Sequence, residues 1–164
     1  MIMLEKVILS ESKTFYDHRG QFTPISLKYN DTMMSKWIQS NVSISAHKNT
    51  FRGLHYQEGI WAQAKLIKVI KGKILDVVVD LRKNSPNYNK AEIFMLNPDN
   101  QLYVPRHFAH GFLTLEDECI VQYHVDNDYN KEMERTLFWN EVKEVNEILK
   151  DIDLIISEKD KPNL

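Results

Sequence analysis

Short segments of alternating or β-branched residues recur along this chain, while long helical patterns are scarce. Period-two alternation bounded by turn residues is the pattern of half-buried strands. The strongest predicted strands are residues 65–70, 73–82, 91–96 and 119–125. About seven or more strands at this spacing are typical of a sandwich or a jelly-roll barrel. The sequence therefore predicts a mainly β fold, with only a few short helices.

Weaker signals extend this pattern toward the N-terminus. Residues 7–9 and 22–27 are further predicted strands. Residues 17–20 between them have turn composition, which places Arg19 on a loop. Residues 29–37 allow either a short helix or a loose connection.

Residues 38–45 alternate clearly between polar and apolar side chains. Two interpretations of the polar face stay open. It is either a solvated outer surface or the wall of a wet cavity in which amides bind a ligand. The residues on this face are Gln39, Asn41, Ser43 and Ser45.

The C-terminal part changes character after Trp139. Apolar residues between positions 142 and 149 have helical spacing, whereas residues 157–160 return to the composition of a loop or a disordered tail. The sequence contains no internal repeat or linker. Its 164 residues, 43% of them hydrophobic and 27% charged, suit a single domain spanning residues 1–164.

Charge and cysteine content narrow the class of protein. Lys plus Arg number 21 against 23 for Asp plus Glu, so the basic excess usual for binding nucleic acid or an anionic membrane is missing. Cys119 is the single cysteine, which excludes an intrachain disulfide and suits a reducing cytoplasm. Glu5 and Lys6 interrupt the apolar N-terminus, and no apolar run reaches the roughly 20 residues of a membrane span. We expect a soluble, cytoplasmic protein.

The stretch at residues 52–57 combines a guanidinium, an imidazole and an amide around a glycine. On a strand that lines a cavity, Arg52 would bind an anion and His55 would transfer protons. A lone histidine of this kind is more often structural. Strict alternation also puts Arg52 and His55 on opposite faces, and a bulge at Gly53 would turn both inward.

Other kinds of chemistry lack their motifs. His55 has no histidine and carboxylate partners at the spacing of a metal site, and His107 and His110 follow Pro105 on a predicted turn without an adjacent carboxylate. The five glycines form no phosphate-binding loop, and no serine has the setting of a nucleophile. Acid–base chemistry by His, Tyr and Asp remains, with Lys and Arg as electrostatic supports.

Two further residues are predicted to point inward. Alternation places Tyr123 on the apolar face of its strand and gives Lys65 apolar neighbours on its face. A core tyrosine bonded to a backbone carbonyl and a lysine that reaches the surface are the alternatives.

Eight blocks, taken in order, resemble those of the dTDP-4-dehydrorhamnose 3,5-epimerase family. The resemblance covers nearly the whole chain, and the order of the blocks makes it specific. It implies a cupin-type jelly roll that works without a metal or an organic cofactor, usually as a dimer that exchanges N-terminal strands. It also implies a nucleotide-linked 4-keto-6-deoxy sugar as substrate. The blocks are residues 15–20 (FYDHRG), 39–41 (QSN), 52–57 (RGLHYQ), 62–65 (AQAK), 80–86 (DLRKNSP), 105–112 (PRHFAHGF), 139–141 (WNE) and 157–160 (SEKD).

The same resemblance implies roles for individual residues. His55 matches the base and Asp160 the carboxylate that pairs with it, so the apparently loose tail would fold back onto the site. Tyr123 matches the acid that serves the opposite face of the sugar, and Lys65 is placed to stabilise charge on the C4 oxygen. The positions that match nucleotide-binding and sugar-binding residues are Arg19, Gln39, Asn41, Arg52, His110, Tyr129, Glu134 and Lys159.

The sequence departs from the family pattern at a few positions. Pro24 stands where a glutamate is common, Asp128 where a tyrosine often precedes the position of Tyr129, and Arg106-His107 replaces a common Glu-Gly pair. These changes leave GDP-, UDP- or CDP-sugars open beside dTDP-sugars. A single-centre epimerase, a 3,4-ketoisomerase, and a non-catalytic or metal-binding cupin also remain as alternatives.

Overall fold

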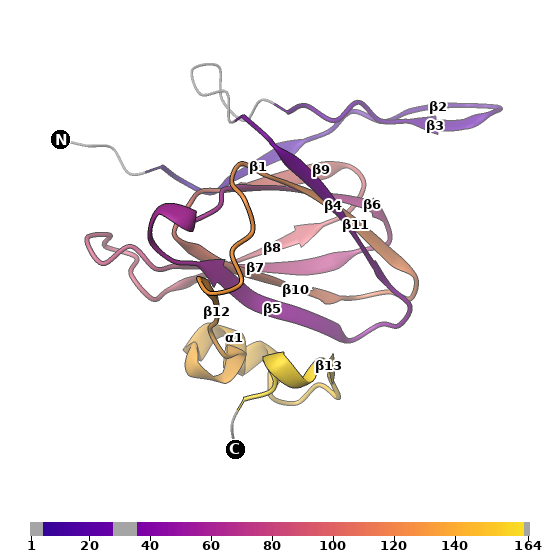
Figure 1. Cartoon of the computed structure of the whole chain (residues 1–164). Coiled ribbons are helices and arrows are strands. Elements are labelled where there is room, and N and C mark those ends of the chain that lie inside the picture. Colours follow the sequence, from indigo (N-terminus) through magenta and orange to yellow (C-terminus); the bar gives the residue numbers. More distant parts are fainter. Residues whose placement is uncertain (1–4, 28–35, 163–164) are drawn as a thin grey trace.

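The computed structural model describes residues 5–27 and 36–162. Most of this part of the chain lies in two sheets that face each other (Figure 1). The five-stranded sheet has the order β1 (Ile8–Glu11), β9 (Asn100–Val104), β6 (Lys65–Lys71), β11 (Cys119–Val125) and β4 (Gln39–Ser45). The six-stranded sheet has the order β12 (Glu134–Thr136), β5 (Thr50–Gln57), β10 (Phe108–Thr114), β7 (Ile74–Asp80) and β8 (Ala91–Leu96), with β13 (Ile155–Ile156) parallel to β5.

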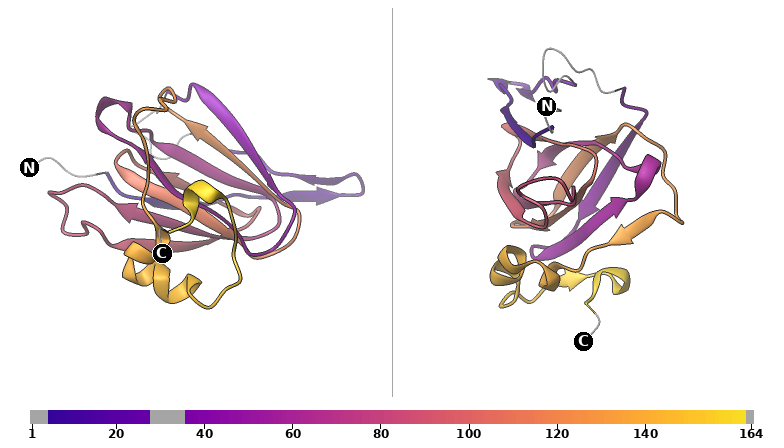
Figure 2. Two further views of the ribbon diagram at one scale, coloured as in Figure 1. Left: turned by 60° about the horizontal axis from the view of Figure 1, so that its bottom comes forward. Right: turned by 90° about the vertical axis from the view of Figure 1, so that its left-hand side faces the viewer.

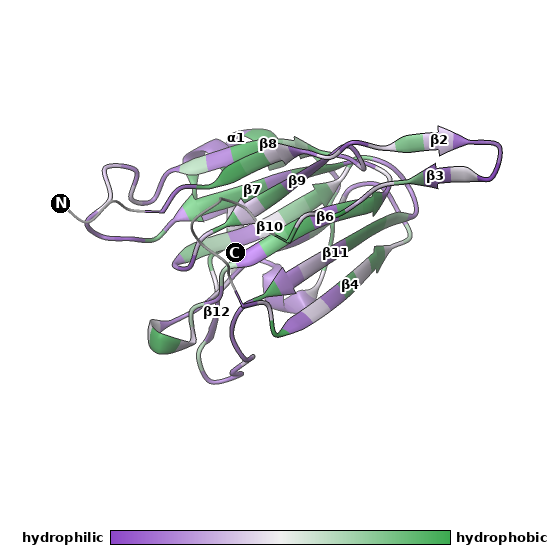
Figure 3. Ribbon diagram, turned by 90° about the horizontal axis from the view of Figure 1, so that it is seen from above, coloured by the Kyte–Doolittle hydropathy of each residue, from purple (hydrophilic) through white to green (hydrophobic). Residues whose placement is uncertain are grey.

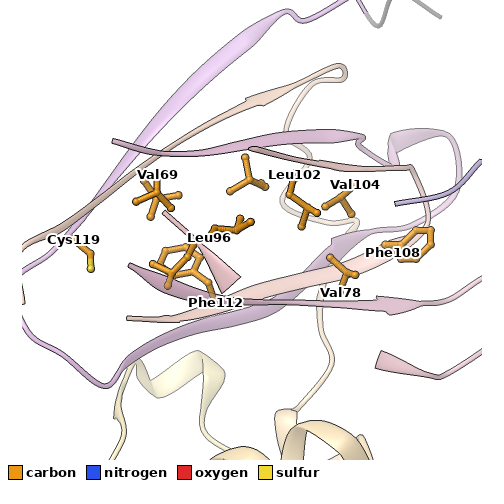
Figure 4. Close-up of a cluster of buried hydrophobic side chains, with 11 residues drawn as sticks. Val69, Val78, Leu96, Leu102, Val104, Phe108, Phe112 and Cys119 are labelled. Atoms are coloured by element: carbon orange, nitrogen blue, oxygen red, sulfur yellow. The ribbon is translucent and has the colours of Figure 1, made fainter. Parts of the chain in front are cut away.

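The predicted jelly-roll architecture is confirmed, in the form of an open sandwich. Its core lies between the two sheets, where the inward side chains of both form one buried apolar cluster (Figure 4). Val69, Val78, Leu96 and Leu102 are at most 1% exposed within it. Burying a side chain of this size stabilises the fold by about 1.5–3 kcal/mol relative to leaving it in water.

A second apolar cluster joins the outer face of the six-stranded sheet to the C-terminal helix. Val142, Val145 and Leu149 recur at helical spacing and pack against Phe51 and Leu54 of β5. The predicted helix is confirmed as α1 (Lys143–Leu149), which lies beneath this sheet in Figures 1 and 2. Within the described residues, no helix has the length and apolarity needed to span a membrane.

Strand β4 decides between the two interpretations of its polar face. Ser45 is buried and Asn41 and Ser43 are partly buried, so the polar face points into the sandwich. The apolar face points outward instead, with Val42 62% and Ile44 67% exposed. Figure 3 shows these alternating hydrophobic and hydrophilic residues along β4 from above. The polar face therefore lines a cavity, while binding of a ligand by its amides stays a prediction. The apolar face of β4 is left uncovered.

The N-terminal region differs from the prediction. The strand expected at residues 22–27 is wrong, because β3 (Gly20–Phe22) ends at Phe22 and pairs only with β2 (Phe15–Asp17). Pro24 has no N–H for a strand ladder, which is consistent with this early end. The two strands form an N-terminal hairpin that projects beyond both sheets in Figures 1 and 2, and His18 and Arg19 make its turn. The connection expected at residues 29–37 lies largely outside the described residues.

Candidate active site

The open end between the two sheets holds a cavity of about 600 Å³, the main cavity. A smaller side lobe of about 250 Å³ adjoins it through four shared lining residues, His55, Lys65, Tyr123 and Glu134. Strands from both sheets and the C-terminal segment contribute to the walls. The polar residues of the main cavity are Ser43, Thr50, Arg52, His55, Lys65, His110, Tyr123, Glu134, Ser157, Lys159 and Asp160.

A bulge in β5 brings Arg52 and His55 to the same cavity. Against β10, Arg52 is opposite Phe112 and His55 is opposite His110, so β5 has one extra residue between the two pairs. Gly53 has a φ of +126°, and a Cβ at this position would lie 2.6 Å from Cα of Gly111. Only glycine fits this close approach without a shift of the backbone. The bulge predicted at Gly53 is confirmed.

His55 and Asp160 form a hydrogen-bonded pair across the cavity wall. His55 Nε2 lies 2.6 Å from Asp160 Oδ1, and the Asp160 side chain is 3% exposed. The Gly53 N–H donates to Asp160 Oδ2 at 3.3 Å. Burial alone would raise the pKa of the Asp160 carboxyl, but the hydrogen bond and charge of His55, with further hydrogen bonds, hold it below its usual value. Asp160 is therefore a carboxylate, and it accepts a hydrogen bond from the Nε2–H of His55.

The C-terminal segment delivers Asp160 to this position. β13 pairs with the start of β5, and the following 3₁₀ helix η3 (Glu158–Asp160) lies over the cavity. Residues 157–160 are thus an ordered part of the site, and the alternative of a loose tail is wrong. Their polar composition reflects contact with a polar cavity.

Lys65 and Tyr123 both line the main cavity, as the alternation predicted. Burial lowers the pKa of Lys65 to about 8, against the opposing charges of Asp76 and Glu134. Burial raises the pKa of the Tyr123 phenol, and Glu134 adds to this while Arg52 opposes it. Near neutral pH the site therefore holds a charged ammonium and a protonated phenol.

His110 has a partner that the sequence interpretation missed. Its Nε2 lies 2.9 Å from Oδ2 of Asp76 on β7, whose side chain is fully buried. His110 itself lies within β10, so its predicted place on a turn is wrong. Asp76 interrupts a run of β-branched residues on the inward face of β7, and this interruption is the signal that could have identified it.

The edge of the side lobe carries a polar network. Glu134 accepts a hydrogen bond from the Tyr129 hydroxyl at 3.0 Å and an ion-pair contact from Lys159 at 3.3 Å. Burial alone would raise the pKa of Glu134, yet Tyr129 and Lys159 together keep it lowered. Gln39 and Asn41 line the same lobe and are hydrogen-bonded to each other at 2.7 Å.

Of the twelve predicted site residues, Arg19 alone lies away from both the main cavity and the side lobe. The other eleven line the main cavity or the side lobe. Arg19 is at the tip of the N-terminal hairpin, where it pairs with Asp17. Among residues 5–27 and 36–162, no group of three or more His, Cys, Asp or Glu side chains is arranged to hold a metal ion. The metal-free site stays a prediction.

Comparison with known proteins adds to this geometry. Residues 2–164 match the family model described as dTDP-4-dehydrorhamnose 3,5-epimerase. The enzyme of that name from Escherichia coli (strain K12) is 36% identical over 164 residues, covering 96% of this chain and 88% of the relative.

Two solved structures extend the comparison. The dTDP-4-dehydrorhamnose 3,5-epimerase of Bacillus anthracis, with TDP and PPi bound, is 40% identical with a TM-score of 0.79 and covers 94% of this chain and 90% of its own. ChmJ, a 3'-monoepimerase from Streptomyces bikiniensis in complex with dTDP-quinovose, is 26% identical with a TM-score of 0.82 and covers 97% and 83%.

Proposed function

Because this chain belongs to the dTDP-4-dehydrorhamnose 3,5-epimerase family of isomerases, we propose that it inverts C3 and C5 of a nucleotide-linked 4-keto-6-deoxyhexose. The C4 ketone makes the protons on both neighbouring carbons acidic. A base that removes either proton produces an enolate, and protonation from the opposite face inverts the centre. The product belongs to deoxysugar synthesis for surface polysaccharide.

The hydrogen bond between His55 and Asp160 is the observation that carries this proposal. Because the ionised Asp160 accepts a hydrogen bond from Nε2–H, Nδ1 is the basic nitrogen of the neutral ring. After proton removal the imidazolium lies beside a carboxylate, which stabilises it. His55 is therefore the base, and Asp160 fixes its tautomer.

Tyr123 supplies the proton donor, and Lys65 supplies the charge that stabilises the enolate. Tyr123 comes from β11 of the five-stranded sheet, whereas His55 comes from β5 of the six-stranded sheet. A sugar held between them meets the base on one side and the phenol on the other, as inversion requires. The Lys65 ammonium opposes the negative charge that develops on the C4 oxygen.

Positive and amide side chains suit the nucleotide diphosphate. Arg52 is hydrogen-bonded by Nε to Ser45 at 3.2 Å, which fixes its guanidinium at the cavity wall, and Lys159 lies at the rim. Gln39, Asn41, Tyr129 and Glu134 give the side lobe amide, phenol and carboxylate groups suited to a sugar or a base. Arginine and lysine at the main cavity favour the diphosphate there.

A homodimer is part of the proposal. Val42 and Ile44 on the outward face of β4 are 62% and 67% exposed, and Ile38 just before this strand is 50% exposed, on an area that a second copy would cover. The N-terminal hairpin also exposes Phe15 and Phe22. Its projection away from the two sheets gives Arg19 a role in substrate binding only if the hairpin reaches the cavity of a second copy.

A single-centre epimerase is the second candidate function. The favouring observation is the likeness to ChmJ, whose description is that of a 3'-monoepimerase. Both functions would draw on His55, Asp160, Tyr123 and Lys65, so the presence of these residues does not separate them.

Solvent deuterium incorporation tests the proposal. The protein is incubated in D₂O with a panel of dTDP-, GDP-, UDP- and CDP-linked 4-keto-6-deoxyhexoses in the presence of a chelator. We expect exchange at both C3 and C5 of one sugar nucleotide. Exchange at one carbon would assign the chain to single-centre epimerases, and no exchange with any member of the panel would reject the proposal.

A further inference from the structure

Asp76 places a carboxyl group inside the apolar core of the sandwich. It lies on β7 between the core residues Ile74 and Val78, and its side chain has no exposed surface. Oδ2 contacts His110, whereas Oδ1 has no hydrogen-bond partner among the described residues. An apolar side chain would fill this position at lower cost, because a buried carboxylate loses its hydration.

The carboxyl of Asp76 interacts electrostatically with the ammonium of Lys65. Burial raises the pKa of the Asp76 carboxyl, and the charges of His110 and Lys65 oppose that rise. Asp76 and Glu134 both raise the pKa of Lys65, and Asp76 has the larger effect. Asp76 and Lys65 therefore stabilise each other's charged forms across the interior.

The other carboxylates around Lys65 are already engaged. Asp160 is hydrogen-bonded to His55, and Glu134 is bonded to Tyr129 and Lys159. Asp76, with one free oxygen, is left to balance the ammonium. The titratable and charged groups that surround Lys65 are Asp76 on β7, His110 on β10, Arg52 and His55 on β5, Tyr123 on β11, Glu134 on β12, and Lys159 and Asp160 on η3.

We propose that Asp76 is a positioning residue, which keeps Lys65 charged and holds the His110 ring by its Nε2 while the enolate forms. The inference rests on the proposed function, because it assigns Lys65 and His110 a role toward the developing C4 oxyanion. Asp76 does not line the cavity and acts only through Lys65 and His110.

The substitution Asp76→Asn tests this role, since it keeps the shape of the side chain and removes the charge. The measurement is the rate of C3 and C5 deuterium exchange as a function of pH. In the wild type the rate should decline at alkaline pH as Lys65 loses its proton, and we call this decline the alkaline limb of the profile. We expect Asp76→Asn to shift the alkaline limb to lower pH by roughly one unit or more. Binding of TDP should stay within about twofold of the wild type, because the proposed diphosphate contacts remain in place. An unmoved limb would overturn the inference.

A double substitution separates an effect through Lys65 from a general one. In a Lys65→Met background, Asp76→Asn should leave the pH dependence of the residual exchange rate unaltered, and only the part of the loss that acts through the His110 contact should remain. A loss as large as in the wild-type background, and equal at every pH, would assign Asp76 a structural role and contradict the proposal.

Asp80→Asn is the matched control. Asp80 is a buried carboxylate on the same strand, but it pairs with Arg82 and Ser85 outside both cavities. The control should lower the melting temperature and leave the alkaline limb where it is. A shift of the limb in this variant as well would show that any buried charge on β7 has the effect.

Lys65→Met provides a second readout if Asp76→Asn does not fold. Without the ammonium, the pKa of the Asp76 carboxyl rises further, so folding takes up a proton and stability falls as the pH rises through that value. The melting temperature of the variant should therefore fall relative to the wild type as the pH rises above about 4, the ordinary pKa of an Asp carboxyl. A constant difference would overturn the inference. Wild-type protein without any exchange activity would instead reject the proposed function itself.

Discussion

His55 and Asp160 are 105 positions apart in the sequence, and their side chains meet at 2.6 Å between Nε2 and Oδ1. The pair joins a central strand of one sheet to the C-terminal segment. β13 aligns that segment along β5, and the bulge at Gly53 turns His55 toward it. The folding of the chain end is thus a condition for the chemistry.

Tyr123→Phe separates proton removal from proton return. The variant keeps the His55–Asp160 pair but lacks the hydroxyl on the opposite wall of the cavity. We expect inversion to fall by roughly 10²–10⁴-fold, the usual contribution of a general acid, while deuterium exchange with retention falls much less. Proton NMR of one reaction in D₂O gives both rates. An equal loss of exchange and inversion would contradict a separate role for the phenol.

Gly53→Ala tests the close contact of β5 with β10. An added Cβ would lie 2.6 Å from Cα of Gly111, at a residue whose φ is +126°. We expect a loss of about 2–4 kcal/mol in unfolding free energy, because backbone strain and a backbone clash add. Chemical denaturation measures it.

Gly59→Ala is the control for Gly53→Ala. Gly59 also has a positive φ, of +60°, but a Cβ there would meet nothing within 4 Å. The unfolding free energy of this control should fall by only about 1 kcal/mol. Equal losses in the two variants would mean that the approach of Gly53 to Gly111 does not constrain the site.

The charge of Lys65 predicts an alkaline limb in the activity of the wild type. Its pKa is lowered to about 8, so the ammonium is lost as the pH rises through that value. Tyr123 keeps its proton in the same range because burial raises its pKa. The exchange rate should therefore decline above pH 8, and Lys65→Arg should abolish this decline while lowering the rate. A wild-type rate that stays flat to about pH 9.5 would contradict the assignment.

Ile44→Arg tests the proposed dimer. Ile44 is 67% exposed on the outward face of β4, where a charge would be buried by a second copy. We expect the variant to sediment as a monomer and the wild type as a dimer in analytical ultracentrifugation. Ile60→Arg is the control, since Ile60 is 84% exposed on the 3₁₀ helix η1 (Gly59–Trp61), away from this face. A dimeric Ile44→Arg variant would place the interface elsewhere.

The sequence predicted the strands between residues 65 and 125 well, because the alternation of polar and apolar side chains reflects which face of a strand is buried. It also located the bulge at Gly53, where the positions of Arg52 and His55 could not otherwise be reconciled. It left the direction of β4 open. Polar residues on one face fit both water and a polar cavity, and only the position of the neighbouring sheet decides between them.

Other features required the packed structure. His110 follows Pro105 closely, which predicts a turn, but pairing with both β5 and β7 makes it part of a strand. Asp76 received no role, because its partner lies on a neighbouring strand 34 positions away. Local sequence patterns carry no information about contacts between residues this far apart in the chain, which form only when the sheets assemble.

The most direct test of the central claim is deuterium incorporation at C3 and C5 by His55→Ala. His47→Ala, at an exposed histidine outside the cavities, is the matched control and should exchange like the wild type. The account predicts that His55→Ala loses exchange at both carbons by at least roughly 10³-fold while still binding TDP. Substantial exchange at both carbons in that variant would show that another group is the base.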